Sequence, residues 1–442
     1  MTALATAMRR NACPGLSRPM PTGDGLLVRL HPQGTIPLPA FAGLCAAARA
    51  YGNGVIEITS RGGIQARGLS AASAARFAAS VATLAIAAED GVPVHCNALA
   101  GIDTEELFDC GVLAAELRHA LAKRSMTPRL AAKTSIAVDG GGTLDLAGLA
   151  ADIRLCAETR NGAVALRVAV GGDATSAAVL GTVAPGRGVE TVMRLLEVLA
   201  RRGRDARARD IVATEGAALF RAAIVELLIP ARPRGSADPA PNSRSRGNER
   251  EEASRTAIGL HRLRDGSFAC GVGPAFGHAD ASALERLVEA ARKAGANGLR
   301  TAPERALLAI KLTPQAAVAF AATAAQLGFV VRADDPRRHI VACAGAPICA
   351  SAHFASRALA PLIAAQAAHE LAGGFTIHLS GCAKGCALSA PADLTVVGTP
   401  DGCALIDHGS ARDTPFAVTP ASELPAAIAQ HLRAQKPEAD HV

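Results

Sequence analysis

Hydrophobic and polar positions follow two periods along the chain, one typical of helices and one typical of strands. Near the N-terminus they predict strands over residues 26–30, 55–59 and 64–69, and helices over residues 38–50 and 71–84. Gly52-Asn53-Gly54 ends the first helix, because glycine readily takes the left-handed backbone of a helix C-terminus. The pattern therefore predicts one strand–helix–strand–strand–helix unit.

The same order of elements recurs in the second half of the chain. Strands are expected over residues 266–271, 299–301 and 306–312, with helices over residues 280–294 and 314–327. Thr59 and Phe77 of the first unit correspond to Thr301 and Phe320 of the second, at nearly the same spacing. A repeat this long is not a solenoid. It predicts a duplicated chain, whose two ferredoxin-like halves face each other across a pseudo-two-fold axis.

A longer α/β region follows each half. The predicted fold class is therefore α+β, with two half-domains and two α/β domains related by the pseudo-two-fold axis. Helices are expected over residues 188–202 and 207–219, and a hairpin over residues 394–397 and 404–406. Residues 230–255 are dense in Pro, Arg, Ser, Asn and Glu, which is typical of a flexible linker. The predicted domains are a half-domain with an N-terminal arm at 1–85, an α/β domain at 91–228, the linker at 230–255, a second half-domain at 256–335 and a second α/β domain at 337–433.

Composition narrows the class of protein. Half of the 442 residues are hydrophobic but only 3% are aromatic, so Ala, Leu and Val must form the core. The net charge of +7 suits an anionic partner. Nucleic acid is not expected, because aromatics are scarce and the one basic run spans residues 201–209. Eleven irregularly spaced cysteines, no apparent signal peptide and no long apolar run indicate a reducing, cytoplasmic compartment and no membrane.

Four cysteines near the C-terminal end carry the strongest chemical signal. Cys343 and Cys349 form a C-x5-C pair, and Cys382 and Cys386 form a C-x3-C pair. Four thiolates on two glycine-containing loops are typical of an iron–sulfur cluster, and Lys384 can offset its negative charge. Two alternatives stay open. Structural zinc usually has shorter C-x2-C pairs, and free cysteines are often simply buried.

These features together resemble the siroheme-dependent sulfite and nitrite reductase superfamily over nearly the whole chain. Three strings resemble its precorrin-3B synthase branch. They are the Ala-Cys-Pro-Gly-Leu-Ser-x-Pro-Met-Pro-Thr-Gly-Asp-Gly stretch that begins at Ala12, Thr-Ser-Arg-Gly-Gly-Ile-Gln at 59–65, and His-Leu-Ser-Gly-Cys-Ala-Lys-Gly-Cys-Ala at 378–387. The resemblance implies a nitrite/sulfite reductase-like architecture, a 4Fe–4S cluster on the four cysteines and a separate mononuclear non-haem iron. It also implies an oxygen-dependent monooxygenase of cobalamin biosynthesis that hydroxylates precorrin-3A and closes a γ-lactone.

The resemblance also nominates residues for the substrate. Arg61 and Lys133 match positions of the superfamily's active site and are expected to be catalytic and to bind substrate, with Gln65 and Arg129 as further binding residues. Arginine suits a tetrapyrrole with many carboxylates, because it pairs with them bidentately. Either cation could instead simply face water. An electron donor, either an NADH-linked reductase or a ferredoxin, is a further expected partner.

Two other functions stay open. A sulfite or nitrite reductase would hold siroheme, with Cys386 between the cluster and the haem iron. Such reductases usually have Arg-Asn where this chain has Cys96-Asn97, and this difference favours the synthase. A non-catalytic electron carrier would not need two duplicated halves. Non-haem iron often takes two histidines and a carboxylate, but no motif nominates ligands among the histidines that lie near the family strings, which are His31, His95, His353 and His378.

Overall fold

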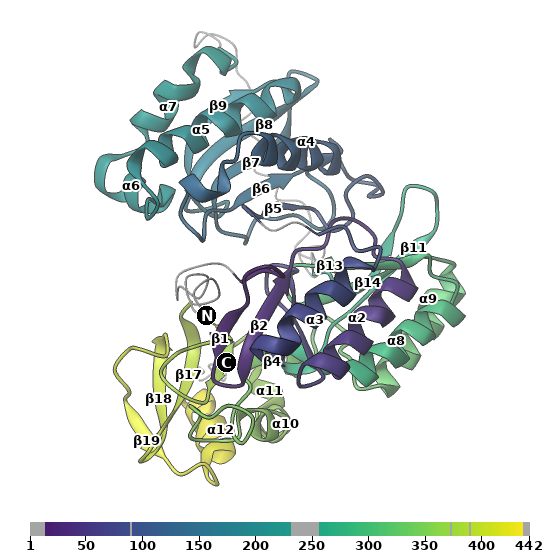
Figure 1. Cartoon of the computed structure of the whole chain (residues 1–442). Coiled ribbons are helices and arrows are strands. Elements are labelled where there is room, and N and C mark those ends of the chain that lie inside the picture. Colours follow the sequence, from purple (N-terminus) through teal and green to yellow (C-terminus); the bar gives the residue numbers. More distant parts are fainter. Residues whose placement is uncertain (1–13, 89–90, 231–255, 372–373, 389, 436–442) are drawn as a thin grey trace, which may run out of the picture.

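The computed structural model describes residues 14–88, 91–230, 256–371, 374–388 and 390–435. The chain forms three bodies, with the two ferredoxin-like halves between an α/β domain at the top and a second one at the lower left of Figure 1. Most of the expected linker, residues 231–255, lies outside the described residues.

The two halves have the same internal topology. In both, the three shared strands are antiparallel and follow the order β2-β4-β3 or β11-β14-β13. The first half contains β1 (Met20–Thr22), β2 (Gly25–Leu30), α2 (Leu38–Tyr51), β3 (Val55–Ile58), β4 (Ile64–Leu69) and α3 (Ala71–Ala82). The second contains β10 (Gly259–Arg262), β11 (Phe268–Val272), β12 (His278–Asp280), α8 (Ala281–Lys293), β13 (Gly298–Ala302), β14 (Ala306–Leu312) and α9 (Pro314–Gln326).

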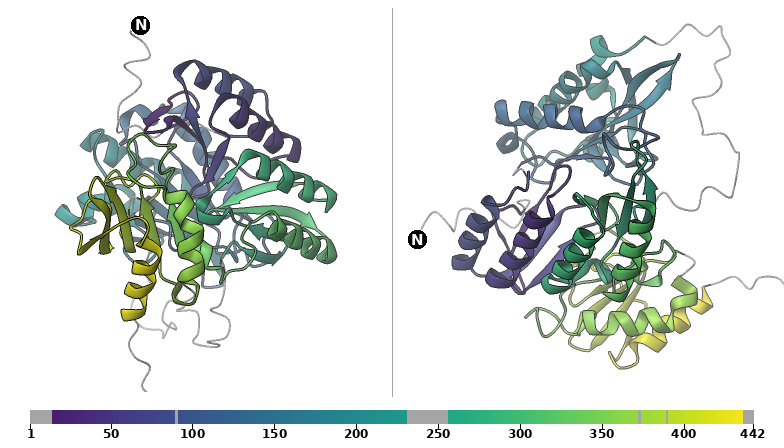
Figure 2. Two further views of the ribbon diagram at one scale, coloured as in Figure 1. Left: turned by 90° about the horizontal axis from the view of Figure 1, so that it is seen from below. Right: turned by 90° about the vertical axis from the view of Figure 1, so that its right-hand side faces the viewer.

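One hydrophobic core joins the halves. The four helices of the halves lie side by side over their sheets (Figure 2), and buried side chains of both halves form a single cluster. Phe77 and Phe320, the pair matched in the repeat, are both buried in this cluster. Strand β12 adds to the sheet of the first half by pairing with β3. The halves are therefore packed as one unit.

The two α/β domains also match each other. Their strand orders, β5-β6-β7-β8-β9 and β15-β16-β17-β18-β19, have the same sequence of two parallel and two antiparallel pairings. The first domain contains β5 (Val94–Cys96), α4 (Cys110–Lys123), β6 (Ile136–Asp139), β7 (Ala151–Arg160), β8 (Ala163–Gly172), β9 (Ala178–Val183), α5 (Gly188–Arg202), α6 (Ala208–Glu215) and α7 (Ala218–Ile224). The second contains β15 (Ile340–Ala342), α10 (Ser356–Gln366), α11 (Ala368–Leu371), β16 (Ile377–Ser380), β17 (Ala392–Thr399), β18 (Gly402–Gly409), β19 (Ala417–Thr419) and α12 (Leu424–Ala434).

The structure differs from the sequence-based expectations in two segments of the first α/β domain. The helix expected over residues 207–219 is two helices, α6 and α7, because Gly216 takes a left-handed φ of 78° between them. The long strands β7 and β8 have no counterpart in the expectations. The expected hairpin is present as β17 and β18.

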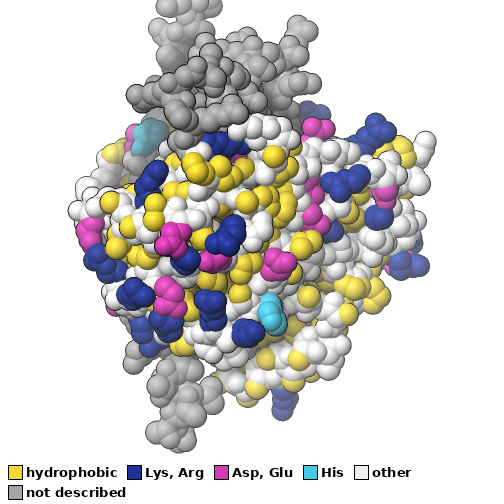
Figure 3. Space-filling model, turned by 90° about the horizontal axis from the view of Figure 1, so that it is seen from above, with side chains coloured by type: hydrophobic (Ala, Val, Ile, Leu, Met, Phe, Trp, Pro, Cys, Tyr) yellow, Lys and Arg dark blue, Asp and Glu magenta, His cyan; other side chains and the backbone are white. Residues whose placement is uncertain are grey.

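The charges are mixed on one face of the molecule. On the face seen in Figure 3, Lys and Arg side chains lie among Asp and Glu, with apolar side chains between them. Within the described part of the chain, no helix is long and apolar enough to cross a membrane.

Candidate functional site

The second α/β domain brings the four predicted cysteines to one edge of its sheet. Cys343 directly follows β15, and Cys382 follows β16 by two residues. Strands β15 and β16 are parallel neighbours, so their carboxyl ends lie at the same edge. The Cys343 N–H donates to the carbonyl of Leu379 at 3.0 Å, which ties the first cysteine loop to β16.

Electrostatics shows that the cysteines form one group. Desolvation raises the pKa of the Cys386 thiol, and Arg67 opposes this by stabilising the thiolate. Charge on the three other cysteines, Cys343, Cys382 and Cys349, raises the pKa further. The Gly381 N–H donates to the Cys343 Sγ at 3.0 Å, as backbone amides do to cluster ligands. Lys384 Nζ, on the loop between Cys382 and Cys386, donates to Ser351 Oγ at 2.9 Å.

Two observations favour a cluster over a zinc ion. The C-x5-C spacing of Cys343 and Cys349 is wider than the spacing of about two to four residues usual in structural zinc sites. The Gly381 amide also donates to Cys343 Sγ, as backbone amides do in cluster sites. The four cysteines therefore fit a cluster better than zinc.

The turn between β1 and β2 covers the first cysteine loop. The Ala350 N–H donates to the carbonyl of Gly23 at 3.0 Å. A Cβ placed on Gly23 would lie 2.2 Å from Cys349 Sγ, so only glycine fits at this point. The adjacent Asp24 holds this turn to β4 through its carboxylate, which accepts from Arg67 Nε at 2.9 Å and Nη2 at 3.0 Å.

A buried ion-pair network extends from this contact into the cysteine domain. Glu57 on β3 pairs with Arg67 at 3.2 Å and with Arg357 of α10 at 2.9 Å. Arg67 interacts electrostatically with Cys386, and Arg357 with Cys343. The network therefore joins the first half to the cysteine domain and places two guanidinium groups near the thiols. Removing one partner from such a buried pair typically costs about 3–5 kcal/mol.

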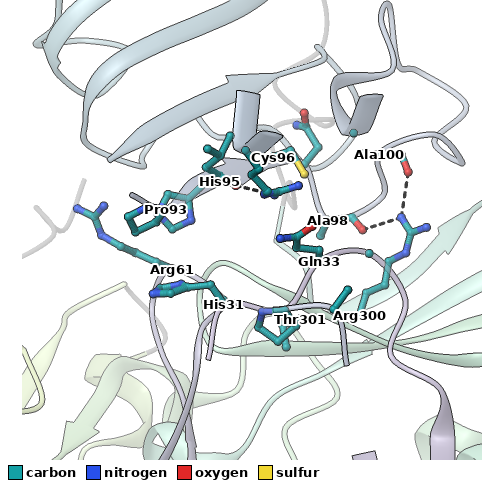
Figure 4. Close-up of a pocket in the computed structure, with 18 of the residues that line it drawn as sticks. His31, Gln33, Arg61, Pro93, His95, Cys96, Ala98, Ala100, Arg300 and Thr301 are labelled. Carbon is teal, nitrogen blue, oxygen red and sulfur yellow. Dashed lines mark hydrogen bonds between the residues drawn. The ribbon is translucent and has the colours of Figure 1, made fainter. Parts of the chain in front are cut away.

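A second feature is a cavity of about 380 Å³ between the first half, the first α/β domain and β13 (Figure 4). Its lining includes three arginines, Arg61, Arg118 and Arg300, and no acidic side chain among the described lining residues. Arg61 Nη1 donates to Ser135 Oγ at 3.3 Å. Arg300 is fixed by Thr35 Oγ1 at 2.8 Å and by the carbonyls of Ala98 and Ala100, which are 3.1 and 3.0 Å away.

The cavity wall also carries titratable groups. His31 and His95 have ring centroids 6.0 Å apart. Burial lowers the pKa of His95 to about 3, and the charges of neighbouring His31, Arg61 and Arg118 act in the same direction, so its ring is neutral at pH 7. A hydrogen bond with Cys110 lowers the pKa of the Cys96 thiol to about 7.

Strand β4 runs between these two regions. Arg61 lies in the turn before β4, at the cavity, and Arg67 lies near its other end, by Cys386. At about 3.3 Å per residue, Arg61 and Arg67 are at most about 20 Å apart. The cavity and the cysteine edge therefore lie near opposite ends of one strand.

Comparisons with known proteins agree with this architecture. The nitrite/sulfite reductase ferredoxin-like half domain matches residues 18–83, and the nitrite and sulphite reductase 4Fe-4S domain matches residues 90–228. A precorrin-3B synthase of Sinorhizobium sp. is 39% identical over 425 residues, which cover 96% of this chain and 88% of the relative. The chain belongs to the precorrin-3B synthase family. It is therefore an oxidoreductase enzyme of the iron–sulfur type.

Two more distant matches are to a sulfite reductase and to a protein of known structure. A sulfite reductase [ferredoxin] 2 of Mycolicibacterium paratuberculosis is 27% identical over 148 residues, covering 32% of this chain and 27% of the relative. The structure of the Mycobacterium tuberculosis NirA protein aligns with a TM-score of 0.72 over 94% of this chain and 82% of that one. At 19% identity, this last match shows the shared fold alone.

The four residues predicted to bind the substrate lie in different parts of the structure. Arg61 lines the cavity, whereas Lys133 is exposed in the loop before β6, two residues from the Ser135 that Arg61 contacts. Gln65 is half-buried within β4. Arg129 forms a bidentate pair with Glu197 at 2.7 Å on an exposed surface. The roles of all four stay predictions.

Proposed function

We propose that the chain catalyses the oxygen-dependent conversion of precorrin-3A to precorrin-3B. In this reaction the meso carbon between rings A and D is hydroxylated, and the ring A acetate closes into a γ-lactone. The observation that carries the proposal is the cavity at one end of β4, which has three arginines and no acidic side chain among its described lining residues, in a chain of the precorrin-3B synthase family. Such a lining suits a macrocycle that carries many carboxylates.

The arginines of the cavity are suited to bind and orient this substrate. Arg300 is held by three oxygen acceptors, so little side-chain entropy is lost when it meets a carboxylate. Arg61 stands in the turn between β3 and β4 and can contact the macrocycle from the first half. Because the cavity is partly shielded from water, each charge-assisted hydrogen bond is stronger than at an open surface.

The cysteine edge would hold the redox group. Cys343, Cys349, Cys382 and Cys386 would ligate a 4Fe–4S cluster, which supplies electrons one at a time when it is bound. Arg67 and Arg357 would partly neutralise the thiolates. We further propose a mononuclear non-haem iron for the oxygen chemistry and an NADH-linked reductase or a ferredoxin as electron donor. The ten cysteines that the structure describes form no disulfide with one another, which supports a reducing cytoplasm.

The alternative is a siroheme-dependent reductase, since two nitrite/sulfite reductase domain families match residues 18–83 and 90–228. The cysteine at position 96 of the cavity wall argues against a reductase. Cys96 stands where the reductases usually have arginine, so a small oxyanion would have one cation fewer to bind it.

The test is to incubate the purified protein with precorrin-3A and a reductant, with and without oxygen. We expect a product heavier by one oxygen atom only in the aerobic sample, detected by mass and absorbance. Labelled molecular oxygen should appear in the new hydroxyl group. Product formed equally well without oxygen would overturn the proposal. A strong haem absorption band with loss of nitrite would instead identify the reductase.

A further inference from the structure

The paired histidines of the cavity have no role in the function proposed so far. His31 follows β2 of the first half, and His95 lies in β5 of the first α/β domain. Figure 4 shows them entering the cavity from different walls. Their ring planes are inclined by 79°, with the centroids 6.0 Å apart.

We propose that His31 and His95 are the protein ligands of a single iron(II) ion in this cavity, and that non-protein ligands complete its coordination. The proposal rests on the proposed oxygenase function. It assigns the site of the second iron, for which no sequence motif nominates ligands.

The distance between the rings permits a shared ion. An imidazole nitrogen lies about 1.1 Å from its ring centroid and about 2.1 Å from a bound divalent metal. Two rings on one ion therefore have centroids at most about 6.4 Å apart. The observed 6.0 Å lies within that limit and corresponds to a wide angle at the metal.

The environment of His95 favours a ligand at its ring. Its Nε2 atom is fully buried and has no hydrogen-bond partner in the described part of the protein. Leaving a buried polar atom without a partner costs about 1–3 kcal/mol. Coordination of Nε2 to a metal ion would remove that cost.

The same cavity explains why only two protein ligands are proposed. Within residues 14–435, apart from the segments that are not described, no three His, Cys, Asp or Glu side chains gather around one point. A complete site with two histidines and one carboxylate is therefore absent from the described residues. Arg61 and Arg118 lie near His95 and repel a dication. An anionic ligand from outside the protein, such as hydroxide or a substrate carboxylate, would offset that repulsion.

The experiment compares His31→Ala, His95→Ala and the double variant with His119→Ala, which removes an exposed histidine of α4 outside the cavity. Iron and acid-labile sulfide are measured per chain, together with the Mössbauer spectrum. We expect the wild type and His119→Ala to hold iron in excess of sulfide and a high-spin ferrous signal. Each cavity variant should lose the excess iron and that signal, and keep its sulfide.

A second measurement guards against a variant that does not fold. Cobalt(II) is added to the wild-type protein from which the excess iron has been removed, and nitrogen hyperfine couplings are recorded by pulsed electron paramagnetic resonance. Couplings from two imidazoles are expected, and none or one would overturn the site. Excess iron retained in the double variant would also overturn it. In that case oxygen-dependent turnover would still stand, whereas loss of oxygen dependence in the wild type would refute the proposed function itself.

Discussion

The chemistry of the two sites depends on a small number of side chains, and only some of these could be predicted from the sequence. The cysteine ligands could be predicted because each pair lies within one short loop, so spacing alone encodes the site. His31 and His95 could not be paired in this way. They belong to different domains, and only tertiary packing brings them into one cavity. Arg300 was missed for the same reason, since it reaches the cavity from the second half.

Arg61 is the predicted binding residue that the structure places at the cavity, and it provides a test at this scale. Changing it to glutamine, Arg61→Gln, removes a charge-assisted contact with a substrate carboxylate, worth about 1.5–3 kcal/mol. We expect kcat/KM for precorrin-3A to fall about tenfold to hundredfold. Arg76→Gln, on the exposed surface of α3, is the matched control and should be unchanged. Equal kcat/KM for both variants would exclude Arg61 from substrate binding.

At the scale of elements, the sequence predicts the half-domains better than the first α/β domain. Strands β4 and β14 of the two half-domains have the predicted bounds, because turn residues before each strand mark its start. Strands β7 and β8 were missed because alanines blur the alternation of apolar and polar positions. The Asn161-Gly162 pair could have revealed this hairpin, because Asn-Gly is typical of two-residue hairpin turns. Both residues have positive φ in the structure, as such turns require.

His278 on strand β12 leads to a prediction about how the stability of the protein depends on pH. Burial, with the nearby charges of Arg357 and Arg67, lowers the pKa of His278 to about 3 from an ordinary value of 6.5. Below pH 6.5 the unfolded chain binds a proton at this histidine and the folded chain does not. Stability is therefore lost as the pH falls from 6.5 toward 3, by about 2 kcal/mol between pH 7 and pH 5.

Urea unfolding at these two pH values measures the effect. His278→Asn cannot titrate in this range, so it should lose about 2 kcal/mol less than the wild type between pH 7 and pH 5. His119→Ala lacks an exposed histidine and should follow the wild type. The same pH dependence in His278→Asn and the wild type would show that His278 is not held neutral in the folded state.

At the scale of the whole molecule, duplication is the feature that the sequence predicted most usefully. The repeat of Thr59 and Phe77 at Thr301 and Phe320 indicated two halves, and both halves have the same strand order. The predicted duplication of the α/β domains is confirmed by their matching strand orders, whereas the sequence did not reveal that β12 joins the opposite half. Pairings between distant segments leave no local pattern. This packing brings the cavity and the cysteine edge to opposite ends of β4.

The iron and acid-labile sulfide content of the purified protein, read with its absorption spectrum, tests the central claim most directly. The account predicts a 4Fe–4S cluster, one further iron atom and no haem band. Cys382→Ala should lose the sulfide, while Cys156→Ala, a half-buried cysteine of β7, should keep it. A protein with a siroheme band, or one whose sulfide survives in Cys382→Ala, would contradict the account.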